Sequence, residues 1–410
     1  MHRFFSFYFA IFFILTSTTL FAKEEEPTLS DLTEDASLLE NNTEYSMSIL
    51  TCGKGSELYA SFGHTAIRIQ EKNSGLDRVY NYGVFNFSDS KFYQKFTLGK
   101  LDYYLDTSSY DNFINEYEYY ERQVKEQQLD LPQAEIESVV NFLNNNLLPE
   151  NKYYRYDFTE DNCATRVRDI FPEVLGINFL WGEILNNKRA SYRHAINLEL
   201  GHNPWARFGI NLLLGSTVDK TIDDDQIMFL PIYLEEGLKN AKYRMEPLVK
   251  ETKIVQDKQE TLPLRINGPL WMNIGILLLT ALSFHVRIFS YLKPIIRFLL
   301  LFSVGALGCI MLFMWIFTNH EQCAANYNIL WAVPIHIVIA FVAHKRTEWM
   351  RIFSLLFISL LMVAFIIHLI GIQILPLIEI APLLLALMYI YIDMYKSSSG
   401  SEVSSAVVDS

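Results

Sequence analysis

The chain has 410 residues, of which half are hydrophobic, yet its formal net charge is −12 at pH 7. These two properties belong to different parts of the sequence: acidic and polar residues dominate the first two-thirds, and long apolar runs fill the last third. The composition therefore excludes a single uniform soluble domain, and its change near Gly268 marks the border between two units.

The N-terminus has the features of an export signal. A charged start is followed by an apolar stretch from Phe4 to Thr16, and small and polar residues then lead to Ala22. The apolar stretch is short for a membrane span, so the sequence predicts a cleaved signal peptide over residues 1–22 rather than an uncleaved anchor. Residues 23–44 are rich in Glu, Asp, Ser and Thr, which predicts a flexible acidic segment before the exported domain.

Alternating apolar and polar residues predict strands at the start of the exported domain, which we assign to residues 45–267. The first run, Tyr45–Leu50, ends near Cys52 and is followed by a glycine-containing turn. His64–Ile69 and Arg78–Phe85 have strand-like composition, and a hairpin-like turn separates them. The first part of this domain is therefore expected to be a β-sheet.

Helical patterns follow further along the exported domain. Gln133–Leu148 repeats apolar positions at helical spacing and ends before a proline, which predicts a helix. Tyr153–Phe158 is strand-like, and Thr159–Asn162 contains cap candidates for a helix over about Cys163–Ile170. The segment Asn203–Gly215 predicts an amphipathic helix that either lies on the membrane or is buried in the protein.

Aromatic residues are dense between Phe85 and Tyr120. Such residues are expected mainly in strands and in the core, because they bury large apolar areas. A face that rests on lipid headgroups is the other interpretation, because Tyr and Trp are favoured at that boundary. The sequence leaves both interpretations open.

Five apolar runs after Gly268 each have nearly the ~20 residues that cross a bilayer as a helix. They predict a helical transmembrane domain of about five helices over residues 268–395, with a cytoplasmic tail over 396–410. The third run is the shortest, and Pro334 and His336 interrupt it with elements that usually face other helices or a cavity. The runs cover about 269–287, 295–317, 329–343, 352–371 and 375–393.

Basic residues decide the orientation of these runs. Lys and Arg follow the first and third runs and begin the tail, whereas the loops after the second and fourth runs contain neither. Positive loops stay in the cytoplasm, so the N-terminal domain lies outside, in agreement with the export signal. The outer loop near Cys323 contains His320, Asn326 and Asn328, which form a polar turn, line a substrate path or dock the outer domain.

Cys163 and His64 are the candidate reactive pair. Cys163 follows Asn162 at a predicted helix N-terminus, where unpaired N–H groups and a partial positive charge favour a thiolate. A nearby imidazole would complete the activation, and the same N–H groups could bind an oxyanion. On spacing alone, a buried cysteine and a satisfied core histidine are the favoured interpretation of these residues.

The four cysteines, Cys52, Cys163, Cys309 and Cys323, do not form a disulfide framework. Exported domains usually pair their cysteines, so a Cys52–Cys163 disulfide is one interpretation. A stable bond of this kind would exclude Cys163 as a nucleophile. Cys309 lies within an apolar run and is expected to be a small core residue.

The order of three motifs strengthens the interpretation of the reactive pair. The motifs are Phe62–Ile69, Asn81-Tyr82-Gly83 and Asp161–Thr165, and together they resemble the Lnb N-terminal periplasmic domain family. That family is similar to circularly permuted NlpC-type, papain-like hydrolases, in which the histidine strand precedes the cysteine helix. The resemblance implies an α+β fold: a permuted papain-like (NlpC-type) extracytoplasmic domain followed by an α-helical transmembrane bundle.

The resemblance also implies a function, because family members in Bacteroidetes-like bacteria are associated with N-acylation of lipoproteins. The resemblance implies that this chain is a multi-pass protein of the bacterial inner membrane with its N-terminal domain in the periplasm. It also implies that the chain is a cysteine-dependent acyltransferase. It would move an acyl chain from a phospholipid, through a thioester, to the α-amino group of a diacylglyceryl-cysteine lipoprotein. No metal-ligand spacing or phosphate-binding loop is present, and we expect no cofactor, no metal and no nucleic-acid partner.

In this mechanism Cys163 is the nucleophile, His64 is the general base and acid, and a third polar residue orients the imidazole. Asn81 is the candidate for this third role, although a strand-end turn residue is the alternative. Asn162 and Arg166 are expected to order the cysteine loop or contact the substrate, Arg166 through a phosphate headgroup. The expected substrate-binding set comprises Asn162, Arg166, His320, Asn326 and Asn328.

Two other functions remain open. A membrane-anchored cysteine peptidase or amidase acting on the cell wall would use the same Cys and His, but its domain should work when cut free at about Leu262. A non-enzymatic envelope assembly protein with a degenerate papain-like domain would tolerate loss of Cys163.

Overall fold

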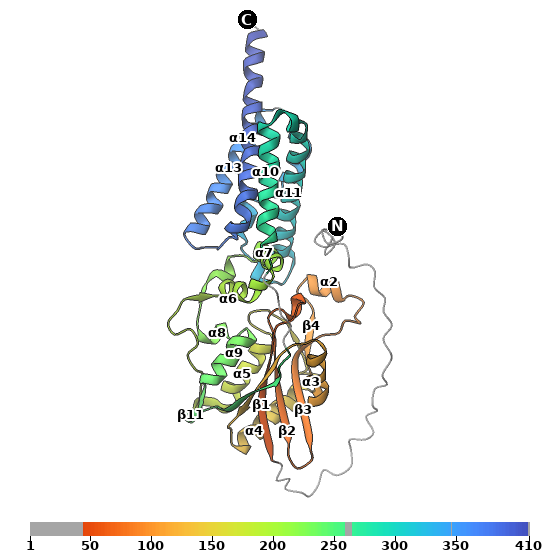
Figure 1. The fold of residues 1–410 in the computed structure, drawn as a ribbon, viewed down its shortest axis with the longest axis vertical. Helices are drawn as coiled ribbons and strands as arrows, with labels where there is room; N and C mark the ends of the chain where they lie inside the picture. The colour runs from red at the N-terminus through yellow and green to blue at the C-terminus, as the bar shows by residue number, and fades with distance from the viewer. Residues whose placement is uncertain (1–43, 259–264, 346, 409–410) are drawn as a thin grey trace. The chain divides into compact units, whose positions relative to one another are not determined.

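The computed structural model describes residues 44–258, 265–345 and 347–408. The predicted signal peptide and all but the last residue of the acidic segment lie outside these residues. The described chain begins with a mixed α+β domain and continues into a set of long helices (Figure 1). The expected α+β domain followed by a helical membrane region is therefore confirmed.

The α+β domain contains a seven-stranded antiparallel sheet with the strand order β12-β5-β1-β2-β3-β4-β6. The three strands predicted first are confirmed and lie side by side at its centre. Tyr45 pairs with Glu71 at one end of β1 and β2, and Cys52 pairs with His64 at the other. The strands are β1 (Tyr45–Cys52), β2 (His64–Glu71), β3 (Leu76–Val84), β4 (Asp102–Ser109), β5 (Val124–Leu129), β6 (Tyr153–Arg155) and β12 (Val249–Gln256).

Helices cover both faces of this sheet, because alternate residues of each strand point to opposite sides. Met47 and Ile49 of β1 belong to the larger core, which includes side chains of α4 (Gln133–Asn146) and α5 (Cys163–Leu175). Leu50 belongs to a smaller cluster on the other face, under α3 (Tyr110–Tyr119). The two helices expected after the sheet strands are thus confirmed as α4 and α5. Their buried side chains pack α5 against the centre of the sheet.

A smaller helical region follows α5 and leads towards the membrane helices. Its core is a separate cluster around Tyr192, Ile196 and Phe229. Arg193 is fully buried there and pairs with Asp219. Its guanidinium also donates to the backbone carbonyls of Leu214 and Gly215, just after α7. The helices are α6 (Tyr192–Glu199), α7 (Pro204–Leu213), α8 (Asp224–Ile227) and α9 (Pro231–Asn240), with α2 (Phe92–Thr97) in the first half of the domain.

Four helices in the described residues are long and apolar enough to cross a membrane. They coincide with the first, second, fourth and fifth predicted runs. The third run differs: it forms a 3-10 turn, η8 (Tyr327–Leu330), several bends and only seven residues of α-helix, α12 (His336–Val342). The long helices are α10 (Gly268–His285), α11 (Lys293–Phe317), α13 (Glu348–Leu369) and α14 (Leu377–Val408).

This irregular third segment still runs from one end of the helices to the other. Asn326, before it, bonds to carbonyls of α7, whereas Ala343, after it, lines a hollow with Lys293 at the opposite end. Gly305 and Gly308 of α11 explain how it fits, because any side chain there would collide with the backbone of the segment. Non-helical backbone at membrane depth is tolerated where protein surrounds it in this way.

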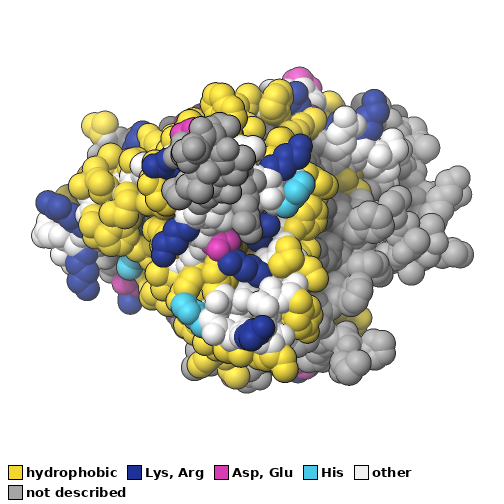
Figure 2. Space-filling view, turned by 90° about the horizontal axis from the view of Figure 1, so that it is seen from above, with side chains coloured by type: hydrophobic (Ala, Val, Ile, Leu, Met, Phe, Trp, Pro, Cys, Tyr) yellow, Lys and Arg dark blue, Asp and Glu magenta, His cyan; other side chains and the backbone are white. Residues whose placement is uncertain are grey.

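The charge distribution on the helices agrees with the predicted orientation. Figure 2 looks onto the end from which the C-terminal part of α14 leaves, and dark-blue Lys and Arg side chains gather around it. Lys293 and Arg297 lie at this end and pair with Asp393 of α14. Helix α14 continues to Val408, so the predicted start of the tail at residue 396 falls within a helix.

The α+β domain and the helices are joined by buried hydrogen bonds within one compact unit, Thr43–Ser410. Helix α7 is the main contact: Phe208 and Leu212 belong to the same apolar cluster as α11, α13 and α14. Arg207 of α7 also pairs with Glu379 of α14 at 2.7 Å. The amphipathic segment predicted over Asn203–Gly215 is therefore a helix packed against the bundle, which agrees with the second of its two interpretations.

Candidate active site

Three of the predicted site residues come together where β2, β3 and α5 meet. Cys163 is the first residue of α5, and the side chain of Asn162 caps this helix by accepting from the N–H groups of Ala164 (2.7 Å) and Thr165 (3.0 Å). His64 begins β2 and Asn81 lies in β3. The capped helix end therefore presents the sulfur of Cys163 to the membrane-side end of the sheet strands.

His64 bridges Asn81 and Cys163. Its Nε2 lies 2.5 Å from the Oδ1 of Asn81, and because an amide oxygen only accepts, Nε2 carries the hydrogen. The other ring nitrogen, Nδ1, is then the one available to the thiol, with which His64 shares a hydrogen bond. This is the nucleophile–base–orienter order that activated cysteines use.

The electrostatics of the pair favour a thiolate and an imidazolium. Burial by itself raises the pKa of the Cys163 thiol, but the charge of His64, its hydrogen bond and two backbone N–H groups outweigh burial and lower that pKa. Burial likewise lowers the pKa of His64, and the Cys163 charge together with the hydrogen bonds to Cys163 and Asn81 raises it. Both shifts show that the ion pair is stabilised, and the lowered thiol pKa increases the fraction of Cys163 present as the nucleophilic thiolate.

Gly83 lies next to this pair in a backbone conformation that favours glycine. Its φ is +94°, and a Cβ there would lie 3.6 Å from the Cβ of Cys163 and 3.9 Å from the Cε1 of His64. The register between β3 and β4 shifts between Asn81 and Val84. The irregularity is the local backbone feature that brings Asn81 and the bare Gly83 to the same pair.

The pair opens into a cavity of about 370 Å³. Its walls are mainly apolar and aromatic, with Phe85, Tyr103 and Tyr156 from one side and Phe62 and Phe229 from another. Concave sites with apolar walls and a few polar groups are typical of small-molecule and lipid sites. The cavity therefore offers a mainly apolar space next to the sulfur.

The outer loop between α11 and η8 completes this cavity. Asn319, His320 and Gln322 are among its lining residues, although they belong to the membrane domain. The Nε2 of Gln322 donates to Asp157 at 2.7 and 2.9 Å and to Thr159 at 2.8 Å. The membrane domain therefore contacts the turn that directly precedes the nucleophile-bearing helix.

The other predicted substrate-binding residues have different surroundings. Asn162 lines the cavity, but its side chain also bonds to the carbonyls of Phe158 and Phe229. Arg166 pairs with Asp161 and lies over the ring of Tyr154, outside the lining of the cavity. In this structure Arg166 therefore contacts the cysteine loop through Asp161 and does not reach the cavity.

Of the outer-loop candidates, His320 lines the cavity and Asn326 and Asn328 do not. Both asparagines are fully buried and donate to backbone carbonyls at Leu212 and its neighbours in α7. Their contacts correspond to the docking role that the sequence left open beside the substrate path.

Cys52 and Cys163 are both free thiols, and Cys52 lies behind the Cys163–His64 pair. Burial raises the pKa of Cys52 to about 12, although a hydrogen bond to Tyr117 opposes this shift. A second cavity of about 590 Å³ is lined by Cys52 on the far side of Gly63 and Pro231. The structure therefore contains no bond between Cys52 and Cys163, and of the four cysteines Cys163 alone lies next to an imidazole at a helix N-terminus. Cys309, which was expected in the core, is instead exposed on α11.

Sequence reasoning did not identify three features of this site: the positive φ of Gly83 beside the pair, Tyr156 as a wall of the cavity, and the contact between Asp157 and Gln322. Asp157 could have been found as a turn residue before the helix, because its Oδ1 accepts from Thr159 and Glu160. Gln322 lies in the polar outer loop that the sequence singled out, but its partner could not be identified because it lies 165 positions away. In the described parts of the chain, no cluster of three or more His, Cys, Asp or Glu residues could hold a metal ion.

Comparison with known proteins identifies both domains. A family model described as the Lnb N-terminal periplasmic domain matches residues 39–183, and one described as the Lnb transmembrane domain matches residues 265–398. No curated protein and no solved structure matches the chain. The two matched regions contain Cys163, His64 and Asn81 in the first and the outer loop with Gln322 in the second.

Proposed function

The chain belongs to the Lnb family, as a multi-pass membrane protein with a periplasmic N-terminal domain, and we propose that it is a cysteine-dependent lipoprotein N-acyltransferase. Its donor is a phospholipid, and its acceptor is the α-amino group of a diacylglyceryl-cysteine lipoprotein. One observation carries the proposal: the Cys163–His64–Asn81 set opens into an apolar cavity whose wall is completed by the membrane domain.

The first half-reaction transfers the acyl chain to the enzyme. The Cys163 thiolate attacks the ester carbonyl carbon of the phospholipid, and the C–O bond to the glycerol then breaks. The His64 imidazolium gives its proton to the departing lysophospholipid oxygen. The products are a thioester on Cys163, a neutral His64 and a lysophospholipid.

The second half-reaction transfers the acyl chain to the lipoprotein. The neutral α-amine attacks the thioester carbonyl, His64 takes the amine proton, and the C–S bond breaks to regenerate the thiolate–imidazolium pair. Water competes with the amine for the thioester. The aromatic walls of the cavity, among them Phe85, Tyr103 and Phe229, exclude water and favour amide formation over hydrolysis.

The outer loop favours the acyltransferase over the cell-wall peptidase. A peptidase domain would need a groove open to the periplasm and would not need the membrane domain. Here Asn319, His320 and Gln322 of the membrane domain form part of the cavity next to the sulfur. A lipid substrate, which is held in the bilayer, explains this arrangement.

The test uses cells that lack the protein and have no second N-acylating enzyme. They are complemented with wild type, Cys163→Ala or His64→Ala, and the N-termini of their lipoproteins are analysed by mass spectrometry. We expect triacylated N-termini with wild type only, and a phospholipid-derived thioester on Cys163 in the purified wild-type protein. Full N-acylation in the strain with Cys163→Ala would refute the proposal.

A further inference from the structure

A surface of exposed aromatic residues borders the cavity on its α2 side. Phe87, Tyr93 and Phe96 have 66%, 56% and 52% of their side-chain surface exposed, which is unusual for three neighbouring large side chains. Phe92 is buried between them and stacks with Phe96, so it fixes α2 to the sheet domain. We call Phe87, Tyr93 and Phe96 the aromatic lip.

The lip is attached to the end of a membrane helix. The N–H of Asn319 donates to the carbonyl of Leu98 at 2.9 Å, and the His320 ring lies 3.2 Å from the carbonyl of Phe96. Helix α11 ends at Phe317, only two residues before Asn319. Two residues span at most about 7 Å, so the lip lies close to the level at which α11 leaves the bilayer.

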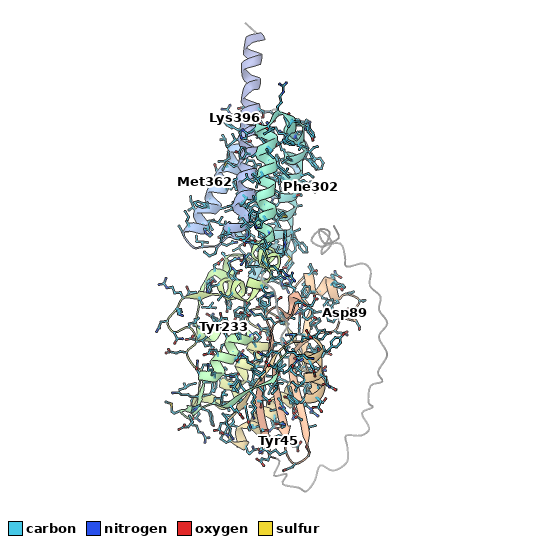
Figure 3. The ribbon with its side chains drawn as sticks, viewed as in Figure 1. Tyr45, Asp89, Tyr233, Phe302, Met362 and Lys396 are labelled. Atoms are coloured by element: carbon cyan, nitrogen blue, oxygen red, sulfur yellow. The ribbon has the colours of Figure 1, made fainter. Side chains whose placement is uncertain are left out.

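The last turn of α11 continues the apolar surface of the lip. Trp315, Ile316 and Phe317 are exposed there, and Trp is enriched where a membrane helix meets the headgroups. In Figure 3, Asp89 of the segment before α2 and Tyr45 at the start of β1 lie at opposite ends of the sheet. The lip therefore belongs to the membrane-side end of the sheet domain.

Charge around the lip is complementary to a phospholipid surface. The chain as a whole carries −12, but residues 85–100 contain three lysines and one aspartate. Lys95 pairs with Asp89 at 2.7 Å, and Lys91 and Lys100 are exposed. Aromatic side chains flanked by lysines are typical of protein surfaces that insert into an anionic headgroup layer.

The lip also forms one rim of the cavity that contains the sulfur. Phe96 and Gly99 line this cavity together with Cys163 and His64. Gly99 has a φ of +65°, and a Cβ there would come within 3.1 Å of Asn319, so the glycine permits the close approach of the lip and the outer loop. The cavity that contains the sulfur therefore reaches both the lip and the outer loop that follows α11.

We propose that the aromatic lip inserts into the periplasmic leaflet of the inner membrane and is the entrance through which the donor acyl chain reaches Cys163. Insertion of the lip stands on the contacts and exposure above, whereas the entry of an acyl donor rests on the proposed function. The lip would let the chain move sideways from the leaflet into the cavity without crossing water.

A crosslinking experiment tests insertion without any activity. The photoreactive residue p-benzoylphenylalanine replaces Tyr93 in the full chain in phospholipid nanodiscs, and adducts are identified by mass spectrometry. The control carries it at Leu76, which is 44% exposed and is the first residue of β3, at the opposite end of β2 and β3. We expect at least about tenfold more phospholipid adduct at Tyr93 than at Leu76. Equal adducts at the two positions, or adducts to lipoprotein instead of phospholipid, would overturn the proposal.

A donor comparison tests the entrance. In the variant Phe87→Asp/Tyr93→Asp, thioester formation on Cys163 should fall about tenfold with a long-chain phospholipid in the nanodisc, because the carboxylates oppose insertion. It should stay unchanged with a short-chain phospholipid that is dissolved as monomers. An equal loss with both donors would contradict the entrance role. If the wild-type protein forms no thioester with either donor, the proposed function fails, whereas the crosslinking result still decides insertion.

Discussion

The sharpest prediction concerns Asn81, which acts through His64 rather than on the substrate. Replacement by Ala removes the acceptor that lies 2.5 Å from the His64 Nε2, whereas Asn81→Asp keeps an oxygen there and adds a negative charge. Asp has nearly the same size as Asn, so Asn81→Asp changes the charge of the acceptor at constant volume, whereas Asn81→Ala removes the acceptor together with its volume.

The structure sets the magnitude of the effect. The imidazolium donates to Asn81 in the ion pair, and a hydrogen bond to a charged group contributes about 1.5–3 kcal/mol. Since about 1.36 kcal/mol corresponds to a tenfold change in rate, Asn81→Ala should lower the rate of acyl loading by roughly 10- to 150-fold. Asn81→Asp should retain activity within about tenfold of wild type, because its carboxylate still accepts.

The direction of the pH effect follows from the two pKa shifts. The ion pair forms as the pH rises through the lowered pKa of Cys163, and it is lost as the pH rises through the raised pKa of His64. A plot of reaction rate against pH therefore has an acid limb, where the ion pair forms, and an alkaline limb, where it is lost. Loss of the Asn81 acceptor destabilises the imidazolium, so Asn81→Ala should move the acid limb to higher pH and the alkaline limb to lower pH. Asn81→Asp should move both limbs the other way.

Two measurements follow these limbs. Alkylation of Cys163 by iodoacetamide, measured by peptide mass spectrometry, reports the formation of the thiolate and therefore the acid limb. Formation of the acyl thioester additionally needs the imidazolium and reports the alkaline limb. Identical profiles for wild type, Asn81→Ala and Asn81→Asp would refute the assignment of Asn81 as the residue that orients His64.

Three further predictions concern the surroundings of the site. Gln322→Glu places a carboxylate against Asp157, so thioester formation should fall at least about tenfold and further than in Gln322→Ala; activity equal to wild type would show that the contact is dispensable. Cys52→Ala should leave thioester formation unchanged, because burial holds that thiol protonated, and a thioester found on Cys52 would reject this explanation. Gly63→Ala should lower the thermal unfolding midpoint more than Gly75→Ala does. Both glycines have a positive φ, but a Cβ at Gly63 would lie 2.7 Å from the backbone oxygen of Cys52, whereas a Cβ at Gly75 would meet nothing, so the extra cost at Gly63 is about 1–3 kcal/mol. Equal unfolding midpoints for the two variants would contradict this explanation.

The sequence by itself determined the features that depend on neighbouring residues. The alternation in Tyr45–Cys52 and the capping side chain of Asn162 fixed a strand and the start of α5, because strand faces and helix caps are set within a few residues. The positions of the basic loops fixed the orientation of the membrane domain in the same local way. These signals placed Cys163 at a helix N-terminus and His64 at a strand start, as the structure has them.

Only the tertiary structure decided what those residues meet. The contact of Gln322 with Asp157 and the membrane-domain wall of the cavity join positions more than 150 residues apart, and no local pattern encodes such a pair. The broken third segment around α12 was decided by Gly305 and Gly308 of another helix, which let its backbone pack closely. Hydrophobicity measures whether a segment can lie in a membrane, whereas its shape there depends on the neighbours that satisfy its backbone.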